Sequence, residues 1–471
     1  MRIRIWLSKD YRKRQTECKC VVICLHAKLK RYNRFRWVFC QLEVLRQCFP
    51  PSVRSILEEL PDSLDETYER ILKEIRKPNQ VYAHRLLQCL VAAVRPLRVA
   101  ELVEVLTFDF KAEGIPTLNS GWRWEDQEEA VMSACSSLVV IVEDEDSRIV
   151  QFSHFSVKEF LTASRLAEPI RDVSRYHIRL EAAHTILAQA CLGVLLRLDN
   201  HVDCDNIEDF PLARYAAQYW ATHARFEDVS SHIKDGMECL FDGDKPHFAT
   251  WLWIYNEDLG GRSLSTMGPE EPKAVPLYYA AMLGLRDLAE HLISEHPEHL
   301  NARGGYEGVL MHIAAKSGHA NILTLLLEHG ADVDELDEGF TPLHRASLQG
   351  KVEAGQCLLD RGADINAQDK YSNSPLRTAA VFGRVEFARM LLKRGARIDV
   401  QDSDFRTPLH SAVRGGHIQV VRLLLEHGAD VNARDKSGNT PSQLESARWT
   451  PEIAELLSKY GAESVGKSMV V

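Results

Sequence analysis

The sequence predicts a mainly α-helical protein in which a unit of helices and one β-hairpin precedes a solenoid of helical repeats. In the first half of the 471 residues, apolar residues recur at helical spacing around one pair of short strand-like segments. In the second half, a pattern of Pro, Gly and Ala returns at intervals of 33 residues, which is typical of stacked helical units.

The composition is that of an ordinary globular chain. Apolar residues make up 45% and charged residues 26%, which excludes collagen-like and wholly disordered chains. The longest apolar run, from Leu277 to Leu283, is far shorter than the ~20 residues that span a membrane. Most of the 11 cysteines stand singly in helical patterns, so we expect reduced thiols, a cytoplasmic location and no membrane partner.

The N-terminal segment 1–35 is strongly basic, and we expect it to be disordered. Residues 1–36 contain twelve Lys or Arg against two acids, whereas the rest of the chain is acidic overall. Cys18, Cys20, Cys24 and His26 lie in this segment, but their spacing is atypical of a structural zinc site. We therefore predict no metal site and no cofactor.

Between residues 52 and 166 the apolar pattern predicts several helices and two strands. The strands pair as a hairpin around the polar turn 143–147, because two short apolar runs flank it. Helices followed by such a hairpin make a winged-helix arrangement. The predicted helices are 52–77, 82–94, 98–106, 126–135 and 155–166, and the predicted strands are 138–142 and 148–152.

From residue 275 the repeated residues each have a structural purpose. A Thr or Ser followed by Pro opens a helix, because the hydroxyl caps a free N–H and Pro suits the first turn. A Gly nine residues after the start of the unit ends that helix. The histidine of the motif is expected to bond the neighbouring turn. These structural residues are Thr341, Pro342, His344, Gly350, Pro375, Gly383, Thr407, Pro408, His410 and Gly416.

This period and these residues closely resemble the ankyrin repeat, over six units in residues 275–463 with degenerate terminal units. The resemblance implies a helix–turn–helix–loop solenoid that binds a protein partner through loop tips and the concave face. It implies no catalytic residue, no small-molecule substrate and no enzyme activity. Residues 464–471 form a tail after the last unit.

Positions that differ between the units are candidates for partner binding, because the scaffold does not dictate them. Aromatic and Arg side chains on such surfaces are common hot spots. The alternative is that they are simply tolerated surface residues. The candidates are Arg345, Leu348, Tyr371, Phe382, Phe405 and Arg414.

Three motifs in the first half, Arg95–Arg98, Ser133–Leu138 and Phe152–Leu161, resemble the winged-helix region of fungal NACHT proteins of the STAND class. The resemblance implies an end-of-NACHT and winged-helix domain in 36–168 and a helical connecting region in 169–274. The NACHT nucleotide-binding core has no counterpart, since only about 35 residues precede the match and they contain no Gly-rich phosphate loop. We expect a family member without that core, and whether Met1 is the authentic start stays open.

The same resemblance implies that His154 could sense a bound nucleotide, since the family's histidine reaches the phosphates of ADP. The alternative is a helix-start histidine in the domain core. Residues 461–468 match the Walker A pattern, but no strand precedes them and only three residues follow. We therefore expect no phosphate site there.

The sequence favours a non-enzymatic interaction scaffold or recognition module, of the kind found in STAND-type signalling and innate-recognition receptors. One alternative is a nucleotide-dependent switch that acts with a separate NACHT chain. A second is a winged-helix DNA-binding regulator. DNA binding is disfavoured because the helix 126–135 and the hairpin turn are acidic, which predicts no specific nucleic-acid partner.

Overall fold

The computed structural model describes residues 63–462, apart from 111–113, 123, 145–146, 169–171, 200–201, 203–205, 261–268, 270, 306–307 and 445–449. The basic segment 1–35, the tail 464–471 and most of the Walker-like segment lie outside the described residues. No helix in the described part of the chain is long and apolar enough to cross a membrane.

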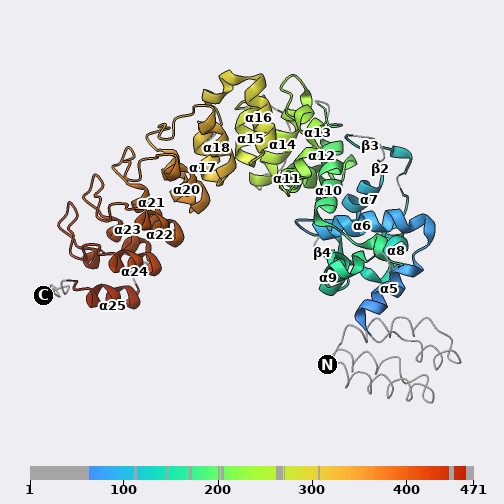
Figure 1. The fold of residues 1–471 in the computed structure, drawn as a ribbon, viewed down its shortest axis with the longest axis horizontal. Coiled ribbons are helices and arrows are strands. Elements are labelled where there is room, and N and C mark those ends of the chain that lie inside the picture. The colour runs from blue at the N-terminus through green and yellow to red at the C-terminus, as the bar shows by residue number, and fades with distance from the viewer. Residues whose placement is uncertain are drawn as a thin grey trace, which may run out of the picture. The chain divides into compact units, whose positions relative to one another are not determined.

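The chain divides into two compact units (Figure 1). The first unit comprises the described residues of Met1–Gly236 and Trp253–Gly268, and the second those of Met237–Leu252 and Pro269–Val471. The predicted fold class is confirmed, because the chain is mainly helical, with a winged-helix part and a repeat part.

In the described residues, the winged-helix part of the first unit combines five α-helices with a three-stranded antiparallel sheet in the order β1-β5-β4 and a two-stranded sheet of β2 and β3. β5 lies in the middle, and Leu97 of β1 is opposite Val150 while Val139 of β4 is opposite Phe152. The elements are α5 (Leu64–Glu74), α6 (Gln80–Ala92), β1 (Leu97–Arg98), α7 (Val99–Leu106), β2 (Phe108–Asp109), β3 (Thr117–Leu118), α8 (Gln127–Cys135), β4 (Val139–Asp144), β5 (Ser147–Phe152) and α9 (Phe155–Thr162).

A buried carboxylate holds β1 against the start of α7. Glu101 is almost fully buried, and it accepts hydrogen bonds from both Arg95 guanidinium nitrogens at 2.6 and 2.8 Å. It also accepts one from the backbone N–H of Arg98 at 2.8 Å. Burying a charge is costly unless it is paired and hydrogen-bonded, and Glu101 satisfies both conditions.

Two predicted details of this part differ from the structure. The helix predicted for 155–166 ends at Thr162, because Ala163 is extended at φ −70°, ψ 132° and a 3₁₀ turn, Ser164–Ala167, follows. The short strands β1, β2 and β3, of two residues each, were also not predicted. A two-residue strand is too short to show an alternating pattern.

The rest of the first unit is helical: α10 (Leu180–Leu195), α11 (Ala213–Ala224), α12 (Val229–His232), and parts of α13 (Lys234–Leu240) and α14 (Pro246–Gly260). A chain of hydrogen bonds joins α10 to α11. The Tyr215 hydroxyl accepts from the Val94 N–H at 3.2 Å and is hydrogen-bonded to His223 Nε2 at 2.9 Å. His223 Nδ1 is hydrogen-bonded to His184 Nδ1, also at 2.9 Å, so both nitrogens of a neutral His223 ring have partners.

The second unit contains the repeated helix pairs (Figure 1). Its first helices pack in a row, and its second helices pack in a parallel row behind them. The first helices are α15 (Pro276–Leu283), α17 (Leu310–Ser317), α19 (Pro342–Gln349), α21 (Pro375–Val381) and α23 (Pro408–Gly415). The second helices are α16 (Arg286–Glu295), α18 (Ala320–Glu328), α20 (Val352–Asp360), α22 (Val385–Lys393), α24 (Ile418–Glu426) and α25 (Pro451–Lys459).

Local sequence explains where these helices begin and end. The Thr341 hydroxyl caps α19 by accepting from the His344 N–H, and Pro342 occupies the first turn. Gly350 ends the helix at φ 73°, a left-handed conformation that costs glycine little. In the last unit, Thr440 opens only a 3₁₀ turn, Pro441–Gln443, where the sequence departs from the repeat.

Hydrogen bonds between side chain and backbone connect consecutive repeats in both directions. His312, His344 and His410 each donate Nε2–H to a carbonyl in the next repeat, at Phe340 (2.8 Å), Asn373 (2.9 Å) and Asn439 (3.2 Å). In the opposite direction, His319, Arg384 and His417 donate to carbonyls at the end of the preceding first helix, those of Met282, Leu348 and Val381, at 2.9 to 3.0 Å.

We expect His344→Ala to lower the free energy of unfolding by about 2 kcal/mol, because it leaves buried polar groups at Thr341 and Asn373 without their hydrogen bonds. The measurement is urea denaturation followed by circular dichroism. The control is His329→Ala, at an exposed position in the neighbouring turn, where the change should stay within ~0.5 kcal/mol. Equal effects of the two substitutions would show that the inter-repeat bond contributes nothing.

We also expect acid to destabilise the protein through His223. Burial, with a contribution from His184, lowers the pKa of His223 from 6.5 to about 3. Between these values the unfolded chain binds the proton and the folded chain does not, so stability falls as the pH falls. The limiting slope from this one group is about 1.4 kcal/mol per pH unit.

The measurement is the free energy of unfolding between pH 6 and 5, where most carboxylates stay ionised. His223→Gln removes the titrating group, so its slope in this range should be shallower than that of the wild type, whatever its absolute stability. Identical slopes would contradict the assignment.

Candidate functional site

The candidate site is built from the loops that precede the first helices of the second unit, which we name the finger loops: residues 336–341, 368–374, 401–407 and 434–440. In three of them a nearly buried aspartate organises the turn. Asp402 Oδ1 accepts from the N–H groups of Asp404 and Arg406, both at 2.8 Å. Asp369 and Asp435 do the same in their own loops, at 2.7 to 2.9 Å. The turns are therefore rigid.

Each of these three turns requires one residue in the left-handed backbone region. Gly438 occupies this position at φ 79° in the last finger loop, and Ser372 occupies it at φ 60°. In the loop between them the residue is Phe405, at φ 59°. A bulky side chain is rare in this conformation and costs free energy, and such strain persists only where the surroundings enforce it. Here the hydrogen bonds of Asp402 enforce it.

Large apolar side chains point to solvent in two consecutive repeats. Tyr371 is 55% exposed, Phe405 is 52% exposed and Phe382 is 45% exposed, and Val381 beside Phe382 is also exposed. Tyr371 and Phe405 lie in adjacent finger loops, which a hydrogen bond from the Ser403 N–H to the Tyr371 carbonyl joins at 3.3 Å. We name Tyr371, Val381, Phe382 and Phe405 the exposed apolar set.

The other predicted candidates differ in their access to solvent. Arg414 is exposed and Leu348 is half-buried. Arg345 has a side chain only 16% exposed, with its guanidinium carbon 4.9 Å from the Phe340 ring centre and a nitrogen 3.9 Å from the Asp337 carboxylate. Arg345 therefore already makes intramolecular contacts that hold its own finger loop.

Two apolar residues of the repeats, Leu336 and Val381, are exposed although neither was a predicted candidate. Leu336 precedes the aspartate of its finger loop, where the other loops have the polar residues Gln368, Gln401 and Arg434. That apolar-for-polar exchange is the signal that could have revealed it. Val381 varies between repeats as strongly as Phe382 does, and the same comparison could have included it.

His154 lies at the N-cap of α9. Its Nδ1 accepts from the backbone N–H of Ser156 at 3.2 Å and lies 2.6 Å from the Ser156 hydroxyl. That hydroxyl is also 2.8 Å from the hydroxyl of Tyr68 on α5. The ring thus caps a helix, which matches the helix-start alternative. Its nucleotide-sensing role stays a prediction.

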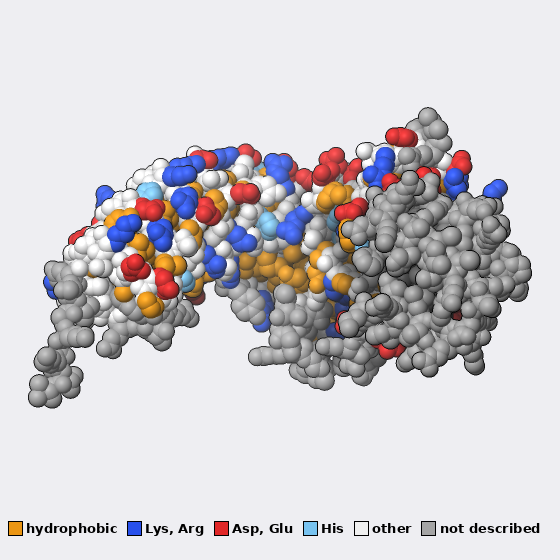
Figure 2. All heavy atoms as spheres, turned by 90° about the horizontal axis from the view of Figure 1, so that it is seen from below, with side chains coloured by type: hydrophobic (Ala, Val, Ile, Leu, Met, Phe, Trp, Pro, Cys, Tyr) orange, Lys and Arg blue, Asp and Glu red, His pale blue; other side chains and the backbone are white. Residues whose placement is uncertain are grey.

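The charges of the winged-helix part do not favour a nucleic acid. Glu128 and Glu129 lie in the first turn of α8, and Arg148 of β5 is paired with Glu128 and with Glu143. On the face drawn in Figure 2, acidic and basic side chains are interspersed over the repeat unit. Binding to duplex DNA depends on clustered Lys and Arg that contact phosphates.

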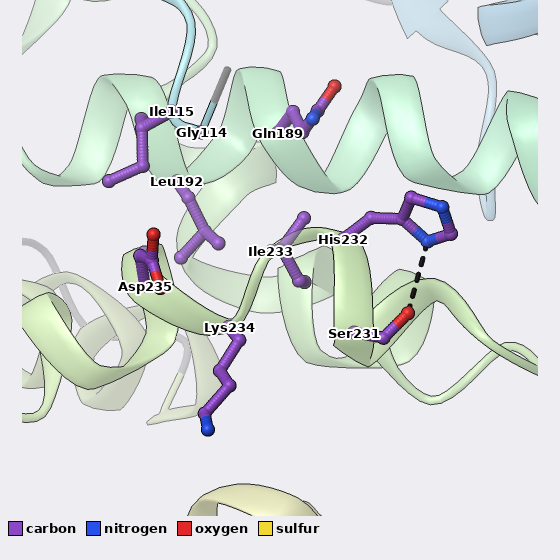
Figure 3. A pocket seen from close by; sticks show the side chains of 10 residues that line it. Gly114, Ile115, Gln189, Leu192, Ser231, His232, Ile233, Lys234 and Asp235 are labelled. Carbon is purple, nitrogen blue, oxygen red and sulfur yellow. Dashed lines mark hydrogen bonds between the residues drawn. The ribbon is translucent and has the colours of Figure 1, made fainter.

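A pocket of about 200 Å³ lies among α10, α12 and α13 of the first unit. Figure 3 shows Ile115, Leu192 and Ile233 in its middle, with polar side chains such as Gln189 and His232 around them. Ligand pockets typically enclose about 300–1,000 Å³, so this one is small for a substrate. We assign it no function.

Comparison with known proteins identifies both parts of the chain. Ankyrin-repeat families match residues 277–369 and 376–467, with a further match at 348–392. The winged helix domain of GPI inositol-deacylase matches residues 68–169. The winged-helix match is to another type than the NACHT-associated winged helix expected from the sequence, and it supports the fold predicted for that region.

Curated relatives share parts of the chain. A Monascus ruber protein named azaphilone pigments biosynthesis cluster protein L is 33% identical over 294 residues, 59% of this chain and 61% of its own. Ankyrin repeat protein nuc-2 of Neurospora crassa is 38% identical over 37% of this chain and 17% of its own. Mouse protein phosphatase 1 regulatory subunit 12A is 39% identical over 18% of this chain and 8% of its own.

The chain therefore spans less than two thirds of each of these relatives. The matches and the geometry agree on the architecture and on its general use. The protein combines a winged helix of the GPI inositol-deacylase type with ankyrin repeats, which form a protein-interaction module.

Proposed function

We propose that the protein is a non-enzymatic recognition module that binds a protein partner through the exposed apolar set. The observation that carries this proposal is the exposure of four large apolar side chains in two consecutive repeats, at positions where the repeats differ. One of the four, Phe405, is held in a strained backbone conformation that a glycine in the next repeat adopts freely.

Two physical arguments support binding at these residues. Exposed aromatic side chains supply most of the energy of many protein interfaces, because they bury a large area with few rotatable bonds. The finger loops are already ordered by their aspartates and by the bonds between repeats. A rigid loop loses little entropy when a partner binds, so more of the contact energy remains as affinity.

We also propose that the chain is the recognition part of a STAND-type signalling receptor and works in the cytosol. The order of a winged helix, connecting helices and ankyrin repeats supports the first point, as do relatives from two fungi. The buried free thiols of Cys89, Cys135 and Cys191 support a reducing compartment. Nucleotide-dependent co-purification of a NACHT ATPase would instead favour the switch that acts with a separate chain.

We expect the double variant Tyr371→Ala, Phe382→Ala to weaken partner binding by ten-fold or more, because the loss of one aromatic anchor typically costs at least about 1 kcal/mol of binding free energy. Affinity capture with the full chain, followed by quantitative mass spectrometry, identifies proteins depleted in the variant sample. Their affinity is then measured with purified components. Tyr460→Ala is the control, since Tyr460 is an exposed aromatic residue at the end of α25 in the last repeat.

The control should retain the captured proteins that the double variant loses. A partner that binds both variants as well as it binds the wild type would place the interface elsewhere and contradict the proposal.

We expect Phe405→Gly to have opposite effects on stability and binding. Glycine relieves the left-handed strain at this position, so the free energy of unfolding should rise by about 1 kcal/mol. Little packing is lost, because half of the side chain is exposed. Binding to the partner identified above should weaken. Urea denaturation and the same affinity measurement test both effects, and a less stable variant would show that the Phe405 ring packs favourably in the free protein.

A further inference from the structure

The turn after α16 departs from the repeat and brings three metal-ligating side chains together. The second helices α18, α20, α22 and α24 are each followed by Gly and Ala, beginning at Gly330, Gly362, Gly395 and Gly428. After α16 the sequence is instead His296-Pro-Glu-His-Leu300. Four other repeats thus form the same pair of helices without these residues. The packing of the helices therefore does not explain why they are present.

The local backbone gives these side chains a fixed arrangement. Pro297 begins the 3₁₀ helix Pro297–Asn301, and backbone bonds from His299 to His296 and from Ala302 to His299, both 3.0 Å, close its turns. His296 Nδ1 lies 3.3 Å from Glu298 Oε1, and His299 Nε2 lies 4.0 Å from the same oxygen. The two imidazole rings are stacked with centres 4.9 Å apart.

All three ligand atoms lie within 4.8 Å of one another, and this is the one such group of His, Cys, Asp or Glu in the described part of the chain. Zinc–nitrogen and zinc–oxygen bonds of about 2.0–2.1 Å in a tetrahedron place neighbouring ligands about 3.4 Å apart. The 3.3 Å separation of His296 Nδ1 and Glu298 Oε1 matches this spacing, and a zinc site further requires the His299 ring to turn out of its stack with the His296 ring.

We propose that His296, Glu298 and His299 bind a divalent transition-metal ion of the zinc class through two imidazole nitrogens and one carboxylate oxygen. Zinc sites with three protein ligands keep the fourth position for water, and His296 and Glu298 are exposed enough for water to reach it.

Such an ion closes the turn between the first and second repeats. It joins the C-cap residue of α16 to the middle of the following 3₁₀ helix, both within the second unit. The proposal does not depend on partner binding at the exposed apolar set, which lies two repeats further along the chain. A failure of one therefore does not affect the other.

The test is titration of the full, reduced chain with Zn²⁺ against a competing chromophoric chelator. The thiols elsewhere in the chain also bind zinc, so the informative quantity is the difference between variants. We expect the double variant His296→Ala, His299→Ala to lose one equivalent of bound zinc, and Glu298→Gln to bind that equivalent at least ten-fold more weakly. Zinc should raise the melting temperature of the wild type more than that of the double variant.

The matched control is His329→Ala. His329 is the C-cap residue of α18, as His296 is of α16, but Gly330 and Ala331 follow it in place of Pro and Glu. This variant should bind as many equivalents as the wild type with the same affinity. Circular dichroism verifies that every variant is folded. If the double variant does not fold, the conservative variant Glu298→Gln still tests the proposal. Equal stoichiometry and affinity in wild type and Glu298→Gln would overturn the proposal.

Discussion

The hydrogen bond from each first-helix histidine to the finger loop of the next repeat sets the geometry on which the second unit depends. A single ankyrin repeat cannot bury its own apolar face, so its loops have a defined position only when the neighbouring repeat provides one. The ring must donate at Nε2 and accept at Nδ1 to join Asn373 with Thr341, which requires a neutral imidazole. Burial lowers the pKa of His344 and keeps it in that state.

In the repeat that begins at Ser374, Arg377 takes the place of this histidine, and the connection to the next finger loop is an ion pair. A guanidinium nitrogen of Arg377 lies 2.5 Å from Asp402 Oδ2, and both side chains are nearly buried. The other oxygen of Asp402 holds the turn that contains Phe405. Arg377 therefore bonds a side-chain carboxylate of the next finger loop, whereas the histidines bond a backbone carbonyl there. One carboxylate thus both connects two repeats and fixes the strained aromatic residue, and a buried charge pair of this kind tolerates the loss of neither partner.

The sequence predicted the helices, the hairpin and the starts of the first helices in the repeats well, because each depends on local rules such as apolar period, capping and glycine stops. It did not predict β1, whose two residues are recognisable only through their pairing with β5. Nor did it show that Arg345 lies over Phe340, or that Phe405 is left-handed, since both follow from tertiary contacts and turn geometry. The exposed Tyr371 and Phe382 were accessible to prediction because comparison between repeats separates scaffold positions from variable ones.

Departures from the repeat fall into two kinds, and the structure separates them. Arg377 breaks the histidine pattern but gains an ion pair that preserves the connection between repeats, so the departure is compensated within the fold. Phe405 takes a position suited to glycine and leaves half of its side chain in solvent. His296, Glu298 and His299 replace a Gly-Ala stop with three polar side chains, of which the first two are exposed. Phe405 strains its own turn, and the second departure adds side chains that the corresponding turns of the other repeats lack. Local rules broken without structural compensation are expected mainly at functional positions, which is the physical reason to look for binding at these two places.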